Sequence, residues 1–312
     1  MSAEKKQKNL NRVTAPPPQL QKKKSWGFLL IWPAFLYILA IVIVYPFIYN
    51  IYRSLFDYSM LTGTSKFVGF SNYGHLLKDP EYLNSISISI GILIVALVIE
   101  TVLGLIIAVM LNQNFKGKVV ARILLILPLG TIPIINGFMF TVLFFPGGGV
   151  VDHILMVLHI IKEPIAWLQE PWLARIVIVL VDVWQWTSFM IIMILAGLSA
   201  VPERYYELAK LDNMSCWKVF WRITLPKIKF TLVLAMLIRM MDLLKYFDPV
   251  FAITQGGPQS ATETVSFFIY RIGFKAFKVG YASAASLMVW LIIWVMSFII
   301  ISKVFTKKEE LI

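Results

Sequence analysis

Residues 86–111 read ISISIGILIVALVIETVLGLIIAVML, and Glu100 is the only charged residue among them. A helix of about 20 mostly apolar residues is long enough to cross the hydrocarbon of a bilayer. In lipid, a helix pairs its own backbone amides and carbonyls, whereas an open strand leaves them without partners. We therefore predict that this stretch is a membrane-spanning helix, and it decides the class of the whole chain.

Five further apolar stretches have a similar length, and they lie at residues 27–52, 119–145, 173–199, 229–253 and 281–304. Of the 312 residues, 59% are apolar and only 15% are charged, and the mean hydropathy is +0.77. Soluble domains are typically about 45–50% apolar. The sequence predicts an all-α integral membrane protein with six transmembrane helices.

The two ends of the chain are polar. Residues 1–26 hold seven of the lysines and arginines together with Pro16, Pro17 and Pro18, and they lack the apolar residues needed to bury a core. We expect a disordered basic tail at 1–26, one transmembrane domain at 27–304 and a short tail at 305–312. The first apolar stretch begins too late and runs too long for a cleavable signal peptide.

The formal net charge of +12 would suggest nucleic-acid binding in a soluble protein. In a membrane protein, lysine and arginine gather in cytoplasmic segments. If both termini are cytoplasmic, as an even number of spans requires, most of the 29 lysines and arginines fall on the cytoplasmic side. We predict that orientation and no nucleic-acid partner. The basic tail could also contact anionic membrane lipid, although a topology signal is the simpler account.

Several kinds of site are absent from the sequence. Cys216 is the only cysteine, and the three histidines lack the spacing of metal ligands. No G-x-x-x-x-G-K-[ST] phosphate-binding loop occurs, so ATP hydrolysis by that route is excluded for this chain. No nucleophile–base arrangement is visible either. We predict no catalytic residues, no metal and no cofactor on this chain.

Residues 200–228 carry the most specific local pattern. Pro202 and Glu203 suit the start of a helix, and Asp212-Asn213 is expected to end it, because asparagine tolerates the left-handed conformation. Ser215 can cap a second short helix, and Leu225-Pro226 is expected to restart the chain as the next span. Such a pair of helices fits either an interfacial linker or a docking element for a cytoplasmic partner, and the residues alone leave both open.

This segment resembles the EAA loop of binding-protein-dependent ABC permeases. Five residues match the family pattern, namely Glu207, Ala209, Ile223, Leu225 and Pro226. Leu208 stands where the family has alanine, and Asn213 stands where it has glycine. Because asparagine is the next best residue for a left-handed turn, we expect the turn to survive.

The resemblance extends along the chain and points to the sugar-permease branch. The matching motifs include Tyr45-Pro46-Phe47-Ile48, Phe67-Val68-Gly69-Phe70, Asp182-Val183-Trp184-Gln185-Trp186-Thr187, Thr254-Gln255-Gly256-Gly257-Pro258 and Gly280-Tyr281-Ala282-Ser283-Ala284. Ser188 replaces a proline that is usual in that branch. The resemblance implies a type I ABC importer permease fold, with residues 27–304 as the permease domain and 200–226 as its coupling segment.

The resemblance also implies partners. Such a permease pairs with a second, similar permease, and this branch usually pairs two different chains. Two ATPase subunits bind below, carrying the ATP and Mg, and an external binding protein delivers the substrate. The expected location is the bacterial plasma (inner) membrane. The residues implied to contact an ATPase subunit are Glu203, Tyr205, Glu207, Leu208, Ala209, Leu211, Asp212, Asn213 and Met214.

Charged residues inside a membrane are costly unless they are paired or wetted. Arg239, Asp242 and Lys245 recur every three residues, so we predict an ion-pair ladder on one side of a helix. Two interpretations remain, either mutual neutralisation between helices or the lining of a wet substrate path. Glu100 and Arg239 favour the first, whereas Asp242, Lys245 and Tyr246 favour the second, and Asp182 and Asp248 are further candidates for the path.

Sugars are bound by aromatic faces and by polar side chains that replace lost hydrogen bonds to water. Trp184, Gln185 and Trp186 suit that chemistry, and Asn136 is a lesser candidate. The alternative for the tryptophans is an aromatic belt at the membrane surface. Residues Gln255, Gly256, Gly257 and Pro258 lie in an external loop, where we expect a tight turn that contacts the binding protein.

Three classes of function compete. The first is the importer subunit, for a sugar or oligosaccharide or, alternatively, for glycerol phosphate or a polyol. The second is an ion-coupled secondary transporter, which usually has more spans and internal repeats than this sequence contains. The third is a membrane enzyme, which needs clustered catalytic side chains. The resemblance favours the first.

Overall fold

The computed structural model describes residues 27–305, so the tail predicted at 1–26 lies outside the described residues. Of the tail predicted at 305–312 only Phe305 is described, and it is the last residue of a helix. The chain divides into two compact units, and the boundary along the sequence falls between Tyr49 and Asn50. The first contains α2 (Gly27–Ile38), the π-helical turn η1 (Leu39–Val44) and the start of α3 (Tyr45–Ser54). Its backbone stays helical through η1, and residues 32–54 form one apolar helix long enough to span a membrane.

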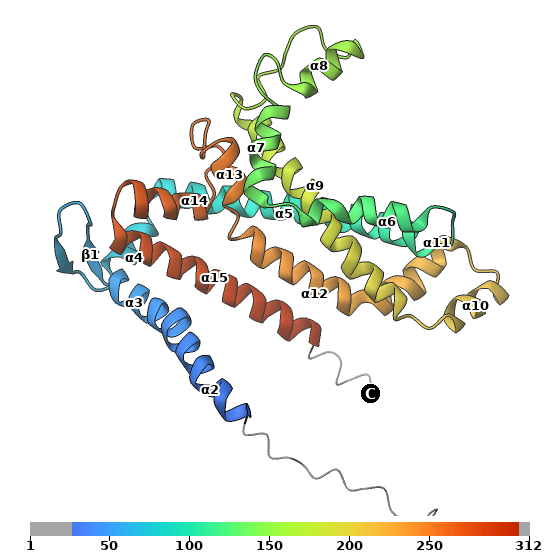
Figure 1. The fold of residues 1–312 in the computed structure, drawn as a ribbon, viewed down its shortest axis with the longest axis horizontal. Helices are drawn as coiled ribbons and strands as arrows, with labels where there is room; N and C mark the ends of the chain where they lie inside the picture. Colours follow the sequence, from blue (N-terminus) through green and yellow to red (C-terminus); the bar gives the residue numbers. More distant parts are fainter. Residues whose placement is uncertain (1–26, 306–312) are drawn as a thin grey trace, which may run out of the picture. The chain divides into compact units, whose positions relative to one another are not determined.

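The second unit contains one β-hairpin and the remaining helices (Figure 1). Its strands are β1 (Phe56–Tyr58) and β2 (Ser65–Phe67), which pair antiparallel. In chain order its helices and helical turns are α4 (Ser71–Leu76), α5 (Pro80–Asn112), α6 (Lys118–Ile126), the 3-10 turn η2 (Leu127–Gly130), α7 (Pro133–Leu143), α8 (Val150–Val157), α9 (Pro171–Ser199), α10 (Arg204–Leu211), α11 (Cys216–Val219), the π turn η3 (Phe220–Thr224), α12 (Leu225–Leu243), α13 (Asp248–Ile253), α14 (Val265–Tyr270), the π turn η4 (Arg271–Lys275) and α15 (Val279–Phe305).

Within residues 27–305, four straight helices are long and apolar enough to cross a membrane, at Trp32–Ser54, Pro80–Asn112, Pro171–Ser199 and Val279–Lys303. The stretch predicted as one span at 119–145 is instead bent by 99° between Gly130 and Pro133. Proline lacks a backbone N–H and disfavours a helical residue before it, which accounts for the break. If this bent pair is one span, residues 27–305 contain five segments that are long and apolar enough to cross a membrane.

The stretch predicted as a span at 229–253 is also divided, into α12 and α13. The break follows from Pro249, which cannot donate to the carbonyl of Lys245, and Phe247 leaves the helical region with φ −132°. Within the same break, the Thr264 hydroxyl donates to the Tyr246 carbonyl at 2.7 Å. Helix α12 carries four charged residues, Lys227, Lys229, Arg239 and Asp242, and is therefore less apolar than the four long helices above.

The all-α prediction missed the hairpin of β1 and β2. Its strands are three residues long, which is too short for an alternating pattern to stand out. Helix α8 has eight residues, which is too short to span a bilayer. Packing of the second unit centres on α5, α9 and α12, which lie side by side in Figure 1.

A proline follows each of two π turns. Pro46 is the second residue after the end of η1, and Pro226 is the second residue after the end of η3. In both cases the N–H before the proline donates to a carbonyl five residues back, from Tyr45 to Ala40 and from Leu225 to Phe220. The wider turn accommodates the proline ring without ending the helix. Helix α12 begins at Leu225, as predicted, but it follows η3 without a break, so the backbone is helical from Cys216 to Leu243.

Candidate functional site

The segment between α9 and α12 contains the two short helices that the sequence predicts. Helix α10 ends in a Schellman motif, in which the Met214 N–H donates to the Ala209 carbonyl and the Asn213 N–H to the Lys210 carbonyl. Asn213 has φ 49°, which is the left-handed conformation expected for it. The Ser215 hydroxyl then accepts from the Lys218 N–H at 3.4 Å and caps α11, as predicted.

The left-handed backbone conformation at position 213 restricts which residues can stand there, and this can be tested. A β-branched residue there should destabilise the turn by about 1–2 kcal/mol, whereas glycine should be tolerated. We expect Asn213→Val to make residues 204–219 more sensitive to limited proteolysis and Asn213→Gly to leave them unchanged. Asp212→Val is the control, because Asp212 has φ −78°. Equal sensitivity of Asn213→Val and this control would contradict the assignment.

The predicted coupling residues divide between two sides of this segment. Ala209 is buried, and Tyr205 and Met214 are partly buried against the protein. The remaining members are exposed, namely Glu203, Glu207, Leu208, Leu211, Asp212 and Asn213. The Leu211 side chain is 78% exposed, and it lies between Glu207 and Asp212 in the sequence. The exposed set combines acidic and apolar side chains on α10 and at its two ends.

Tyr205 anchors α10 to the start of α12. Lys227 Nζ lies 4.2 Å from the centre of the Tyr205 ring, and the guanidinium of Arg204 lies 5.3 Å from it. Hydrogen bonding to Lys227, and then to Arg204, lowers the pKa of the Tyr205 hydroxyl from its ordinary value. A pocket of about 390 Å³ lies beside this anchor, between the end of α5, α10 and α11.

A buried ion triad joins α5, α9 and α12. Arg239 donates Nε and Nη2 to the two carboxylate oxygens of Glu100, at 2.8 and 2.9 Å, and Nη2 also to Asp182 at 2.7 Å. All three side chains are almost completely buried. The bidentate geometry is the strongest that arginine makes with a carboxylate. Asp182, predicted for the substrate path, therefore lies in the packed interior with Glu100 and Arg239.

The predicted ladder is present at the end of α12, with Lys245 in the turn that follows the helix. Arg239 Nη1 lies 4.0 Å from an Asp242 oxygen, and Lys245 Nζ lies 3.5 Å from the other. Exposure rises along it, from 1% for the Arg239 side chain to 38% for Asp242 and 61% for Lys245. The guanidinium of Arg239 also stacks 4.5 Å from the Trp186 ring. The ladder thus leads from the buried triad to an open face.

The polar candidates Asn136 and Gln185 meet at the break before α7. Gln185 donates to the Thr131 carbonyl at 2.9 Å, and Asn136 donates to the Thr131 hydroxyl at 2.8 Å. Ser188 donates to the Leu125 carbonyl at 2.6 Å, so it serves the same bend. This role of Ser188 was not predicted from the sequence. A bend leaves backbone carbonyls without their helical partners, and the need to satisfy them would have been the signal.

The aromatic candidates lie in different surroundings. Trp184 is 38% exposed, and its ring packs 5.9 Å from Phe140. Tyr246 is buried, and its hydroxyl donates to the Ile178 carbonyl. Asp248 is partly exposed at the start of α13. Trp184, Trp186, Asp242, Lys245 and Asp248 therefore retain exposed surface, whereas Asn136, Asp182, Gln185 and Tyr246 are buried.

The loop predicted to contact a binding protein forms a tight turn. Gln255 and Gly256 have φ 49° and 86°, and the Gly257-Pro258 peptide bond is cis. Arg271 lies beside this turn and bridges Glu81 and Glu263, with N–O distances of 2.7 and 2.6 Å. Together these residues line a polar pocket of about 280 Å³.

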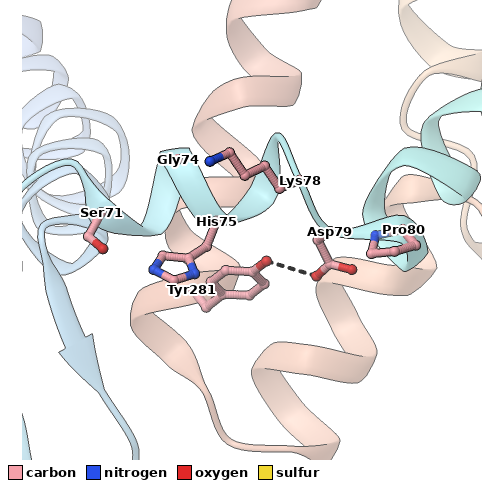
Figure 2. A pocket seen from close by; sticks show the side chains of 7 residues that line it. All are labelled: Ser71, Gly74, His75, Lys78, Asp79, Pro80 and Tyr281. Carbon is pink, nitrogen blue, oxygen red and sulfur yellow. Dashed lines mark hydrogen bonds between the residues drawn. The ribbon is translucent and has the colours of Figure 1, made fainter.

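A second pocket, beside the N-terminus of α5, was not predicted. It has a volume of about 550 Å³, and its lining includes His75, Lys78 and Tyr281 (Figure 2). Tyr281 donates its hydroxyl to Asp79 at 2.8 Å, and the other Asp79 oxygen caps the N-terminus of α5. Among residues 27–305, no group of three or more metal-ligating side chains is placed to hold an ion.

Comparison with known proteins identifies the family. The family described as "Binding-protein-dependent transport system inner membrane component" matches residues 100–303. The trehalose/maltose transport system permease protein MalF of Thermococcus litoralis is 32% identical over 283 residues, covering 90% of this chain and 93% of that protein. The trehalose transport system permease protein SugA of Mycobacterium tuberculosis is 30% identical, covering 89% and 88% respectively.

The fold agrees with a solved permease. A chain of a bacterial ABC transporter involved in import of the acidic polysaccharide alginate superposes with a TM-score of 0.78 at 20% identity, covering 95% of this chain and 96% of that one. These relatives are transport proteins and not enzymes, in agreement with the sequence analysis. The chain belongs to the family of binding-protein-dependent ABC transporter permeases of the inner membrane.

Proposed function

We propose that this chain is one of two permease subunits of a bacterial importer for a sugar or oligosaccharide. The observation that carries the proposal is the α10–α11 segment, in which an exposed acidic and apolar helix ends in a left-handed turn at Asn213. Relatives named for trehalose/maltose, trehalose and lactose support a carbohydrate substrate.

Six crossings account best for the helices. The bent pair α6 and α7 would form the third crossing, and α12 with α13 the fifth. With six crossings both termini lie in the cytoplasm, which puts most lysines and arginines there as well. The α10–α11 segment is then cytoplasmic, and the loop at Gln255–Pro258 faces the external binding protein.

The exposed side of α10 docks into a cleft on an ATPase subunit, which carries the ATP and Mg. Glu207 makes the ion pair in that cleft, and Leu208 and Leu211 supply the apolar contacts. Closure of the ATPase pair moves α10. The unbroken helical backbone from Cys216 to Leu243 carries the movement into the membrane, where it selects between two packed states.

The substrate path follows the exposed path candidates. Trp184 offers an aromatic face, and Asp242, Lys245 and Asp248 offer charged partners for hydroxyl groups. Asn136, Gln185 and Asp182 act by holding the shape of the path, since their polar atoms bond to the protein. The 61% exposure of Lys245 also keeps glycerol phosphate as a second candidate substrate.

The test is ATP hydrolysis by the complete transporter reconstituted in lipid with its binding protein. We expect trehalose, maltose or lactose to stimulate hydrolysis, and Glu207→Ala to reduce this stimulation at least about tenfold, because losing one partner of a desolvated interfacial ion pair costs about 2–5 kcal/mol. Glu163→Ala is the matched control, because Glu163 is an exposed glutamate outside the coupling segment.

Each alternative has its own outcome in this assay. If glycerol 3-phosphate stimulates ATP hydrolysis and none of the sugars does, the substrate is the phosphorylated compound and not a sugar. Stimulation that survives Glu207→Ala at the wild-type level would remove Glu207 from coupling. Transport without ATP hydrolysis would overturn the proposal as a whole.

A further inference from the structure

An apolar groove runs between the C-terminal part of α5 and the helix formed by α11 and η3. Its volume is about 520 Å³, and every residue that lines it is apolar. From α5 it is lined by Val102, Leu105, Ile106, Val109 and Met110, and from the other side by Trp217, Phe220, Trp221 and Leu225. We call these residues the α5–α11 groove.

The groove has the position of a site at a membrane surface. From Val102 to Met110 it extends about 12 Å along α5 at 1.5 Å per residue, and α5 ends two residues later at Asn112. Trp217 is 70% exposed and Trp221 50%, and their rings meet edge to face at 5.6 Å. Exposed tryptophans at the end of a spanning helix are typical of the level of lipid headgroups.

The charges beside the groove have one sign. Lys218 and Arg222 are exposed on the same helical segment as Trp217 and Trp221. Residues 216–229 also include Lys227 and Lys229 and contain no carboxylate. The acidic residues of the neighbouring segment lie on α10 and at its ends, in Glu203, Glu207 and Asp212. An occupant that is apolar at one end and anionic at the other complements this arrangement.

We propose that an anionic phospholipid occupies the α5–α11 groove, with an acyl chain against α5 and its phosphate near Lys218 and Arg222. Two of the groove residues, Val109 and Phe220, also line the pocket between α5, α10 and α11. A molecule in the groove therefore contacts two residues that also line the pocket beside the coupling helix α10. The inference requires that α5 spans the membrane, and it does not depend on the substrate.

The test uses the complete transporter in nanodiscs that contain phosphatidylcholine with either brominated phosphatidylglycerol or brominated phosphatidylcholine. Bromine quenches nearby tryptophan fluorescence. The contribution of Trp217 and Trp221 is obtained by difference from a Trp217→Phe/Trp221→Phe variant, which keeps the groove aromatic. We expect the phosphatidylglycerol to quench these two residues with an apparent affinity about 30-fold higher, which corresponds to about 1 kcal/mol for each of two cations.

Charge-removal variants decide the outcome. Lys218→Gln/Arg222→Gln should abolish the preference for phosphatidylglycerol, whereas the exposed pair Lys66→Gln/Lys78→Gln should leave it unchanged. Equal quenching by the two lipids, or a preference that survives the first variant, would overturn the proposal. Absence of quenching by either lipid would overturn it as well, since a protein subunit would then cover the groove. Sugar-stimulated ATP hydrolysis in the same nanodiscs tests the proposed function separately.

Discussion

Replacement of Arg239 by methionine should strongly lower the stability of the transporter. Arg239 is the only cation of the buried triad, and its removal leaves Glu100 and Asp182 facing each other without a counter-charge. Removing one member of a buried ion pair typically costs about 3–5 kcal/mol. We expect the purified complex to unfold at a clearly lower temperature and to accumulate poorly in the membrane.

Two further variants separate charge from shape at this site. Arg239→Lys keeps the charge but cannot bind two carboxylates with a planar fork, so we expect an intermediate stability. The triple variant Glu100→Gln/Asp182→Asn/Arg239→Met removes all three charges and should recover most of the loss. Lys245→Met is the control, because Lys245 belongs to the same ladder but is largely exposed. If Arg239→Met unfolds at the wild-type temperature, the triad does not stabilise the protein.

The second large effect is expected at Gly137, where α7 and α13 approach most closely. A Cβ atom at this position would lie 2.6 Å from Ala252 Cβ and 3.3 Å from Pro249 Cα. The Thr141 hydroxyl, one turn away, donates to the Gly137 carbonyl at 3.0 Å and contacts the Ala252 carbonyl at 3.4 Å. Small residues permit such close approach of helices in membranes. Gly137→Val should therefore separate the two helices and abolish transport.

The contact can be tested by exchange. Gly137→Ala alone should destabilise the complex by about 1–3 kcal/mol, as overpacked cores do. Gly137→Ala/Ala252→Gly removes the nearest clashing atom and should restore part of the thermal stability and of the sugar uptake. Gly91→Val on α5 is the control, since no atom lies within 4 Å of a Cβ built there. Additive losses in the double variant would show that positions 137 and 252 do not contact each other.

Local signals predicted the coupling segment well. The left-handed residue at Asn213 and the cap at Ser215 depend on neighbouring backbone groups, so the residue types alone specify them. The start of the next helix at Leu225 was also predicted, but its continuity with α11 through η3, just before Pro226, was not. There the π turn η3 relieves the clash of the proline ring, and a wide turn leaves no signature in residue type.

Long-range pairing could be predicted only in part. The three-residue spacing on α12 indicates the contacts of Arg239 with Asp242 and of Asp242 with Lys245. By contrast, Arg239 meets Asp182 and Glu100 across 57 and 139 residues, and no periodicity within one helix indicates which spans lie side by side. For the same reason the sequence could not show that Gln185 of α9 donates to the Thr131 carbonyl at the bend before α7.

The triad also imposes an order on the synthesis of the protein. The ribosome makes Glu100 first, then Asp182, and Arg239 only 139 residues after Glu100. At about 5–20 residues per second, Glu100 waits roughly 7–28 s for its counter-ion. During that interval the carboxyl groups of Glu100 on α5 and Asp182 on α9 lack the guanidinium of Arg239. A nascent chain cut short before α12 therefore carries both carboxyl groups without the counter-ion that binds them in the finished protein.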